Sequence, residues 1–362
     1  MNEEEVVKLF LKNGFQISKN ALSLILENPE QILSELKKMK PRPFIISEQH
    51  LKNIQKPVKM KPTEIKIIKE FKLEKRPVSV KDYVDHFISH YEELKKIISK
   101  KMETERLISI NKIATQTMMC SIIGVVREKN KNNILVEDPT GEVYVFFDDN
   151  LKEKFDEIAL DDVIGVAIKK IKDKYYAKNL IFPDISSNRE INRTESDMVL
   201  AVVSNPSNLG DTRYKNLIST LCSAENLSAI LFFDETKSEK ITYDLSKFSP
   251  IPHKPNPSLV QIDNIKILVL PKIFFETLTF NSNITDPITQ ILKRRHLSPS
   301  LISKNHTGHE DFVLTEIPDI VISNLGVTIN KNYKGTTIVS NSDPNKIFLI
   351  NLKTREVVER TI

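Results

Sequence analysis

Residues 291–299 read ILKRRHLSP, and residues 316–322 read EIPDIVI. In the first segment a basic run at 293–295 stands just before the Ser-Pro pair at 298–299, which is typical of the last turn of a helix and the break after it. The second segment ends in three consecutive apolar residues that the Ser-Asn pair at 323–324 closes, which predicts a buried strand. Together the two segments predict a helix end followed by a strand of a covered sheet.

Two further apolar runs indicate strands of the same kind. Residues 198–204 (MVLAVVS) and 229–233 (AILFF) lack the alternation of a half-exposed strand, as expected for strands covered on both faces. Residues 214–221, between them, have the apolar spacing of a helix. Strand–helix–strand is one α/β unit, so residues 196–362 are predicted to form an α/β domain.

Residues 107–185 have the pattern of a small β-barrel. Strands are predicted at 121–126, 134–138, 142–147, 162–168 and 174–177, with a hairpin turn at 139–141 and a short helix at 151–155. This order of strand, hairpin, helix and two strands is that of an OB-fold. The polar residues 186–197 mark the boundary to the α/β domain.

The chain before the barrel is predicted to have three parts. Residues 1–40 hold three short amphipathic helices, which predict a compact helical module. Residues 41–77 are rich in lysine and proline and lack periodicity, which predicts a basic, flexible linker. Residues 78–106 contain a helix with an apolar stripe. His86 and His90 lie four apart on it, a spacing that metals can use, but no HExxH acid accompanies them and we interpret them as surface histidines.

The composition is that of a folded protein with more than one domain. The 362 residues are 40% hydrophobic and 28% charged, and the formal net charge of +5 permits contact with nucleic acid without arguing for it. Cys120 and Cys222 form no CxxC pair, which predicts buried thiols in a reducing compartment. No apolar run approaches the ~18 residues of a membrane span, and the acidic start is not a signal peptide, so we expect a cytoplasmic protein with no membrane contact.

Several of these segments resemble one family. The segments ILKRRHLSP and IPDI, at 291–299 and 317–320, and the hairpin EDPTG at 137–141 are similar to the small subunit of the archaeal family D DNA polymerase. The resemblance implies a multidomain protein with a helical module, an OB-fold β-barrel and an α/β calcineurin-like phosphoesterase sandwich. In that family the sandwich carries a proofreading 3′–5′ exonuclease, and the partner is a large catalytic subunit that polymerises DNA.

The metal ligands of the family are Asp, His and Asn side chains at the ends of sheet strands. Aligned on the resemblance, Asn205 and Ser207 stand at an aspartate and a histidine position, and Leu325 and Val327 stand at the two histidines after the PDI strand. Asp234 is the one possible survivor. Such a set cannot supply the anionic charge and imidazole nitrogen that the site needs. We therefore predict no catalytic residue, metal or cofactor.

The predicted role follows from this loss. The chain is expected to be a non-catalytic, scaffolding small subunit, similar to the inactivated B-subunits of the eukaryotic replicative polymerases, with DNA contacted weakly or indirectly. The segment KRRH at its helix end would contact the partner or support its own fold, through these residues: Lys293, Arg294, Arg295 and His296.

Two alternatives stay open. One is an active metal-dependent exonuclease with a rearranged site made of His253, His306 and His309, although the HTGH segment at 306–309 precedes the PDI strand instead of following it. The other is a free single-strand binder, whose bases would stack on aromatic residues of the barrel. The same residues also fit an ordinary barrel core. They are Tyr144, Phe146, Tyr175 and Tyr176.

Overall fold

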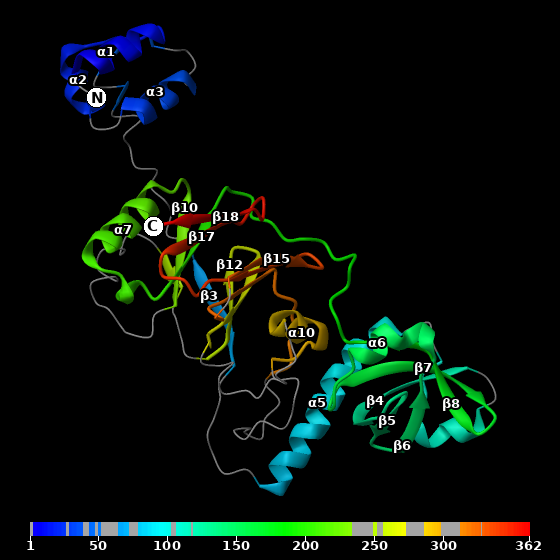
Figure 1. Ribbon diagram of the computed structural model, residues 1–362. Helices are drawn as coiled ribbons and strands as arrows, with labels where there is room; N and C mark the ends of the chain where they lie inside the picture. The colour runs from blue at the N-terminus through cyan, green and yellow to red at the C-terminus, as the bar shows by residue number, and fades with distance from the viewer. Residues whose placement is uncertain are drawn as a thin grey trace. The chain divides into compact units, whose positions relative to one another are not determined.

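The protein, seen in a computed structural model, forms two units, Met1–Pro62 and Thr63–Ile362 (Figure 1). The structure describes residues 3–26, 29–38, 43–47, 50–51, 64–71, 79–102, 106–116, 119–233, 249–251, 256–272, 286–297, 312–326 and 328–362. Within these ranges no helix has the length and apolar character that a membrane span requires.

The first unit packs short helices around one apolar core. Its elements are α1 (Glu3–Lys12), β1 (Gln16–Ile17), α2 (Lys19–Leu26), α3 (Pro29–Lys38) and β2 (Ile45–Ile46). β1 and β2 pair in parallel, and Phe10 and Ile25 lie in the core. Ile46 and Leu51 are fully buried in the same core. The linker predicted from residue 41 is therefore wrong at these two residues, because both side chains are covered by the helices.

The second unit contains a closed five-stranded barrel, which follows a long helix in the chain. Its strands follow the order β4-β5-β6-β8-β7 around the barrel. The elements are α5 (Val80–Lys101), η1 (Ile110–Thr115), β4 (Cys120–Lys129), β5 (Asn133–Asp138), β6 (Gly141–Phe146), η2 (Asp149–Leu151), α6 (Lys152–Asp156), β7 (Val163–Ile171) and β8 (Lys174–Ile181). The predicted barrel strands and short helix are confirmed, and the closed barrel is OB-like.

Two positions shape the β5–β6 hairpin and the contact of β5 with β4. Asp138 accepts the backbone N–H groups of Thr140 and Gly141 through Oδ1, at 2.7 and 3.1 Å, so the EDPTG segment makes its own turn. Oδ2 accepts the N–H of Ile110 at 2.9 Å and fixes η1 beside the turn. A Cβ on Gly124 would lie 2.5 Å from a methyl group of Val136, so β4 approaches β5 too closely for a larger residue.

Helix α5 packs its last three turns on the barrel. Tyr91 donates its hydroxyl to the carbonyl of Ile123 on β4 at 3.1 Å, and Ile98 is fully buried against the same strands. His90, predicted as a surface histidine, is only 2% exposed. Its ring meets that of His296 edge to face, with centroids 4.6 Å apart, so a second element covers it. The side chain of His86 lies outside the described part.

The rest of the second unit forms two sheets. The first has the order β11-β10-β9-β17-β18 and the second β15-β16-β14-β13-β12-β3. The strands are β3 (Ile65–Glu70), β9 (Val199–Ser204), β10 (Leu227–Phe233), β11 (Ser249–Ile251), β12 (Ser258–Ile262), β13 (Ile265–Leu270), β14 (Ile320–Ser323), β15 (Ile329–Tyr333), β16 (Thr336–Ser340), β17 (Lys346–Asn351) and β18 (Val357–Thr361). The helices are η3 (Pro206–Asn208), α7 (Asp211–Ser223) and α10 (Pro287–Arg294).

These elements stack in four layers of helix, sheet, sheet and helix (Figure 1). Val202 of the first sheet and Ile267 of the second share one buried cluster between the sheets. Leu217 of α7 covers the outer face of the first sheet, and Ile291 of α10 covers that of the second. Strands covered on both faces read as continuous apolar runs, as predicted. Cys222 on α7 is exposed, so the prediction of a buried thiol is wrong there.

The segments 291–299 and 316–322, which predict a helix end and a strand, contain the end of α10 and most of β14. α10 begins at Pro287 behind the N-cap Asp286, whose Oδ1 accepts the N–H of Thr289 at 3.2 Å, and ends at Arg294. β14 then carries the apolar run. Asp319, just before it, is fully buried and accepts the N–H of Lys266 at 2.9 Å and a guanidinium N–H of Arg189 at 3.1 Å. The PDI segment thus fixes where β14 begins beside β13.

Strand β3 is the second place where the predicted linker of residues 41–77 is wrong. It forms the edge of the second sheet, antiparallel to β12, although it was assigned to the linker of residues 41–77. Phe71, the next residue, is 1% exposed and donates its N–H to the carbonyl of Pro257 at 2.9 Å. An edge strand with exposed Lys66 and Ile67 has too weak a pattern to be recognised without its neighbour.

Candidate functional site

The predicted metal positions follow strands whose ends lie at one edge of the sandwich. β9 and β10 are parallel in the first sheet, and β13, β14 and β16 are parallel in the second. Ser204 at the end of β9 donates its hydroxyl to the carbonyl of Asn341 at 2.5 Å, which brings the two sets of strand ends together. We call the buried polar residues there the strand-end cluster: Ser204, Ser323, Asn324, Ser340 and Asn341.

The strand-end cluster is held by uncharged hydrogen bonds. Asn341 donates its backbone N–H to the carbonyl of Ser323 at 3.0 Å and its side-chain amide to the carbonyl of Lys346 at 2.9 Å. Asn324 Oδ1 accepts the N–H of Lys272 at 2.5 Å. Ser323 Oγ has no hydrogen-bond partner among the described residues. The cluster therefore offers hydroxyl and amide groups, but neither carboxylate nor imidazole.

The described positions at this edge lie as follows. Asn205 directly follows β9 with a left-handed backbone (φ +46°), and its N–H donates to the carbonyl of Phe233 at 2.6 Å. Leu325 packs against the apolar cluster beneath α10, so its side chain lies among hydrocarbon. Ser207 lies in η3. The positions outside the described residues are Asp234, His253, His306, His309 and Val327.

A dinuclear phosphoesterase centre needs anionic oxygen and imidazole ligands around two divalent ions. The described residues include no group of three or more His, Cys, Asp or Glu side chains that could hold a metal ion. The uncharged donors of the strand-end cluster do not fit such a centre. Sequence reasoning missed this cluster, because serine and asparagine after a strand resemble ordinary turn residues.

Metal content tests this interpretation directly. We expect purified protein, incubated with Mn²⁺ and then desalted, to retain no stoichiometric manganese, iron or zinc, because uncharged ligands cannot offset the desolvation of a divalent cation. Elemental analysis of the full chain is the measurement. Two tightly retained metal ions per chain would contradict the assignment of Asn205, Ser207, Leu325 and Val327 as ligand replacements.

Arg294 joins the sandwich to the barrel. From the last turn of α10 its Nε donates to Asp162 Oδ1 at 2.6 Å, and its Nη2 donates to Oδ2 at 3.1 Å. Nη2 also donates to the carbonyl of Glu157 at 2.8 Å. The Arg294 side chain is 8% exposed and that of Asp162 is 2% exposed. This is a buried, bidentate ion pair between two domains.

The other residues of the KRRH segment also contact their own chain. Arg295 donates to the carbonyls of Leu314 and Thr315 at 2.6 and 2.7 Å, and burial lowers its pKa to about 10. His296 is fully buried against His90. Lys293 pairs with a carboxylate of the barrel and is 14% exposed. Of the two roles left open for these residues, the geometry favours support of the fold.

Three of the four aromatic residues considered for base stacking lie outside the barrel core. Tyr144 is 45% exposed. Phe146 on β6 and Tyr176 on β8 are half-buried neighbours with ring centroids 5.8 Å apart, and Lys174 lies 4.7 Å from the Phe146 centroid. Tyr175 packs partly against the barrel core. The interpretation as core residues therefore holds for Tyr175 alone, and there only in part. We call Tyr144, Phe146 and Tyr176 the aromatic face.

No protein-family model matches the chain. It is similar to the DNA polymerase II small subunit of Archaeoglobus fulgidus, with 25% identity over 208 residues, which are 51% of this chain and 43% of the relative. The small subunit from Methanothermobacter thermautotrophicus is 32% identical over 131 residues, 34% of this chain and 27% of the relative. The chain's matches thus span less than half of either relative.

Among solved structures, an archaeal phosphodiesterase matches 46% of this chain and 100% of its own, with 9% identity and a TM-score of 0.30. That score is too low to support an assignment. The functional argument therefore rests on the two sequence relatives and on the residues of this chain.

Proposed function

We propose that this chain is a non-catalytic small subunit of a family D-type replicative DNA polymerase, which it serves as a scaffold for a large catalytic subunit. The observation that carries the proposal is the uncharged strand-end cluster of the described residues, because the family resemblance implies anionic and imidazole ligands after these strands. It occurs in a chain similar to two polymerase small subunits. Among the described residues, buried apolar clusters lie between the two sheets and on the outer face of each, which supports a structural role for the sandwich.

The second unit is the part proposed to bind the large subunit. A stable protein contact buries roughly 1,000 Å² or more, which a barrel and a sandwich supply more readily than a small helical unit. The buried Arg294–Asp162 pair keeps the barrel and the sandwich together. The partner would therefore meet one composite surface.

Co-purification tests the proposal. We expect a tagged fragment 63–362 to retain the large subunit through an affinity step, while a tagged fragment 1–62 does not. The complex is also expected to gain no Mn²⁺-dependent 3′–5′ exonuclease activity from this chain. Capture of the large subunit by 1–62 alone would overturn the scaffold role.

The exonuclease assay tests the alternative of an active enzyme with a rearranged metal site. Robust Mn²⁺-dependent cleavage by the purified chain, lost when His253, His306 and His309 are changed to alanine, would favour the active alternative. Cleavage that survives this triple change would indicate a contaminating nuclease.

A second candidate function is single-strand binding by the barrel. It is favoured by the aromatic face, whose three rings are half-buried or exposed, and by the lysine beside Phe146. Bases stack on such rings largely without sequence preference, and binding then falls steeply with salt. This activity is compatible with the subunit role, since a polymerase handles single strands.

A further inference from the structure

A cavity of about 400 Å³ lies where the barrel meets the sandwich. Four lysines line it, and each comes from a different element: α5, α6, α10 and the β15–β16 turn. They are Lys101, Lys154, Lys293 and Lys334. Glu157 and Asp184 are the acidic residues of the lining, so its formal charge is positive.

The lysines are positioned but keep donors to spare. Lys101 donates to the carbonyls of Phe182 and Asp184, at 3.2 and 2.5 Å. Lys334 pairs with the Asp184 carboxylate at 2.5 Å, while the nearest acceptors of Lys154 are 3.4 Å away. An ammonium group has three N–H donors, so Lys154 and Lys334 can bind a further anion without losing these contacts.

The charge around the cavity favours an anion. Burial lowers the pKa of Lys101, the Asp184 carboxylate opposes this effect, and the neighbouring cations Lys334 and Arg295 lower the pKa further. Asp184 is already occupied, because it accepts the Tyr333 hydroxyl at 3.0 Å as well as Lys334. A bound phosphate would therefore relieve repulsion between the amines.

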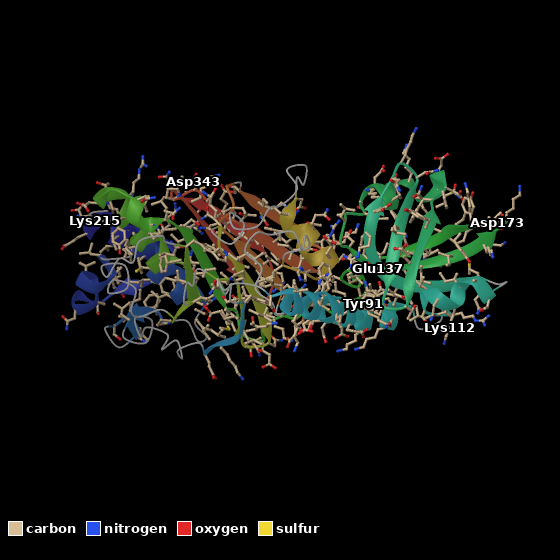
Figure 2. The ribbon with its side chains drawn as sticks, turned by 90° about the horizontal axis from the view of Figure 1, so that it is seen from below. Tyr91, Lys112, Glu137, Asp173, Lys215 and Asp343 are labelled. Atoms are coloured by element: carbon tan, nitrogen blue, oxygen red, sulfur yellow. The ribbon has the colours of Figure 1, made fainter. Side chains whose placement is uncertain are left out.

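Strand β8 connects this cavity to the aromatic face. It begins at Lys174 beside Phe146 and ends at Ile181, which lines the cavity. At ~3.3 Å per residue, Tyr176 and Ile181 are about 17 Å apart along the strand. Figure 2 shows Asp173, in the turn before β8, at one end of the barrel and Tyr91, which packs on β4, towards the other. The exposed Lys178 lies on the same strand between the two sites.

We propose that the lysine-lined cavity binds a backbone phosphate of a single-stranded nucleic acid that runs along β8, with its bases on the aromatic face. Lysine binds phosphate as a point charge, and stacking rings together with a basic groove are what a single strand requires. An acidic protein segment would use the lysines but would have no need of the rings. The proposal extends the barrel-face contact and does not depend on whether the chain is a polymerase subunit.

The test is fluorescence anisotropy with the full chain and labelled oligo-dT of ~12 and ~4 nucleotides. Both lengths lie within the roughly 4–16 nucleotides that one OB-fold binds. The cavity variant combines Lys154→Gln with Lys334→Asn, because Lys334 has φ +47° and asparagine tolerates that backbone. The matched control is Lys152→Gln, on the same short helix but outside the cavity lining. Phe146→Ala tests the aromatic face.

We expect the cavity variant to bind the long oligonucleotide roughly tenfold more weakly, as loss of charged hydrogen bonds implies. Its log–log salt slope should fall by about 0.7, for one lost phosphate contact on a single strand. The short oligonucleotide should be affected by Phe146→Ala but not by the cavity variant. The Lys152→Gln control should match the unmodified chain throughout.

Three results would overturn the proposal. Equal binding by the cavity variant and the control would rule out the cavity as a phosphate site, although single strands could still bind on the aromatic face. If the unmodified chain binds neither oligonucleotide, both the phosphate site and the binding of bases on the aromatic face are ruled out. The subunit role would still be judged by co-purification. Binding of a poly-glutamate peptide that requires Lys154 and Lys334, without effect of these lysines on DNA, would assign the cavity to a protein ligand.

Discussion

Replacing Arg294 with alanine is expected to lower the free energy of unfolding by about 3–5 kcal/mol, because it leaves the buried carboxylate of Asp162 without its partner. Chemical denaturation of the second unit, followed by circular dichroism, is the measurement. The effect should exceed that of most single substitutions, which cost about 1 kcal/mol.

The size of this effect follows from geometry. Arg294 makes two parallel bonds to Asp162, and it also donates to the Glu157 carbonyl and to the side chain of Gln290. The Asp162 carboxylate also accepts the backbone N–H of Ala159 at 2.8 Å. Without Arg294 the carboxylate must either remain charged in a buried site or take up a proton, and both are costly.

Two controls separate the buried pair from charge in general. Lys346→Ala removes an exposed ion pair with Glu359, at 2.6 Å, and should cost at most about 1 kcal/mol. Combining Arg294→Met with Asp162→Asn removes both charges, so it should recover much of the loss seen for Arg294→Ala. A loss below about 1 kcal/mol for Arg294→Ala would show that the pair does not hold the barrel to the sandwich.

The sequence predicted the elements around this pair but not the pair itself. The basic run before Ser298-Pro299 correctly marked the end of α10, because a helix end is a local feature. The partner of Arg294 lies 132 residues earlier, on another domain. His90 was misread for the same reason: its own helix does not show that His296 covers it. Contacts between distant elements leave no periodic pattern.

At the candidate site, too, the sequence predicted the local elements but not the contacts between distant ones. The apolar runs of β9 and β14 placed the strands, and the resemblance placed Asn205 and Leu325 just after them. The strand-end cluster could not be predicted, since its bond from Ser204 to Asn341 joins two sheets. The aromatic face was left open between core and surface, because which side of a strand faces the core depends on how the barrel closes.

The second prediction with a large effect concerns strand β3. We expect a fragment of residues 63–362 to fold with the denaturation midpoint of the second unit in the full chain, and a fragment of residues 78–362 to be insoluble or markedly less stable. Limited proteolysis should likewise give a stable product that begins before Ile65, and not near Pro77 as a linker over 41–77 would imply. Cleavage at Pro77 with an unchanged midpoint would contradict this expectation.

The loss has two physical sources. Without β3, strand β12 becomes the edge of its sheet, and an uncovered edge with buried-type residues such as Val260 invites pairing with other chains. Removing Phe71 also empties a position in the core beneath α10. Truncating a buried phenylalanine to alanine costs about 3–5 kcal/mol by itself. The full-length variant Phe71→Ala therefore separates the contributions, since it keeps the β3–β12 ladder: it should lower stability by that amount but leave the protein soluble, whereas the 78–362 fragment should also aggregate.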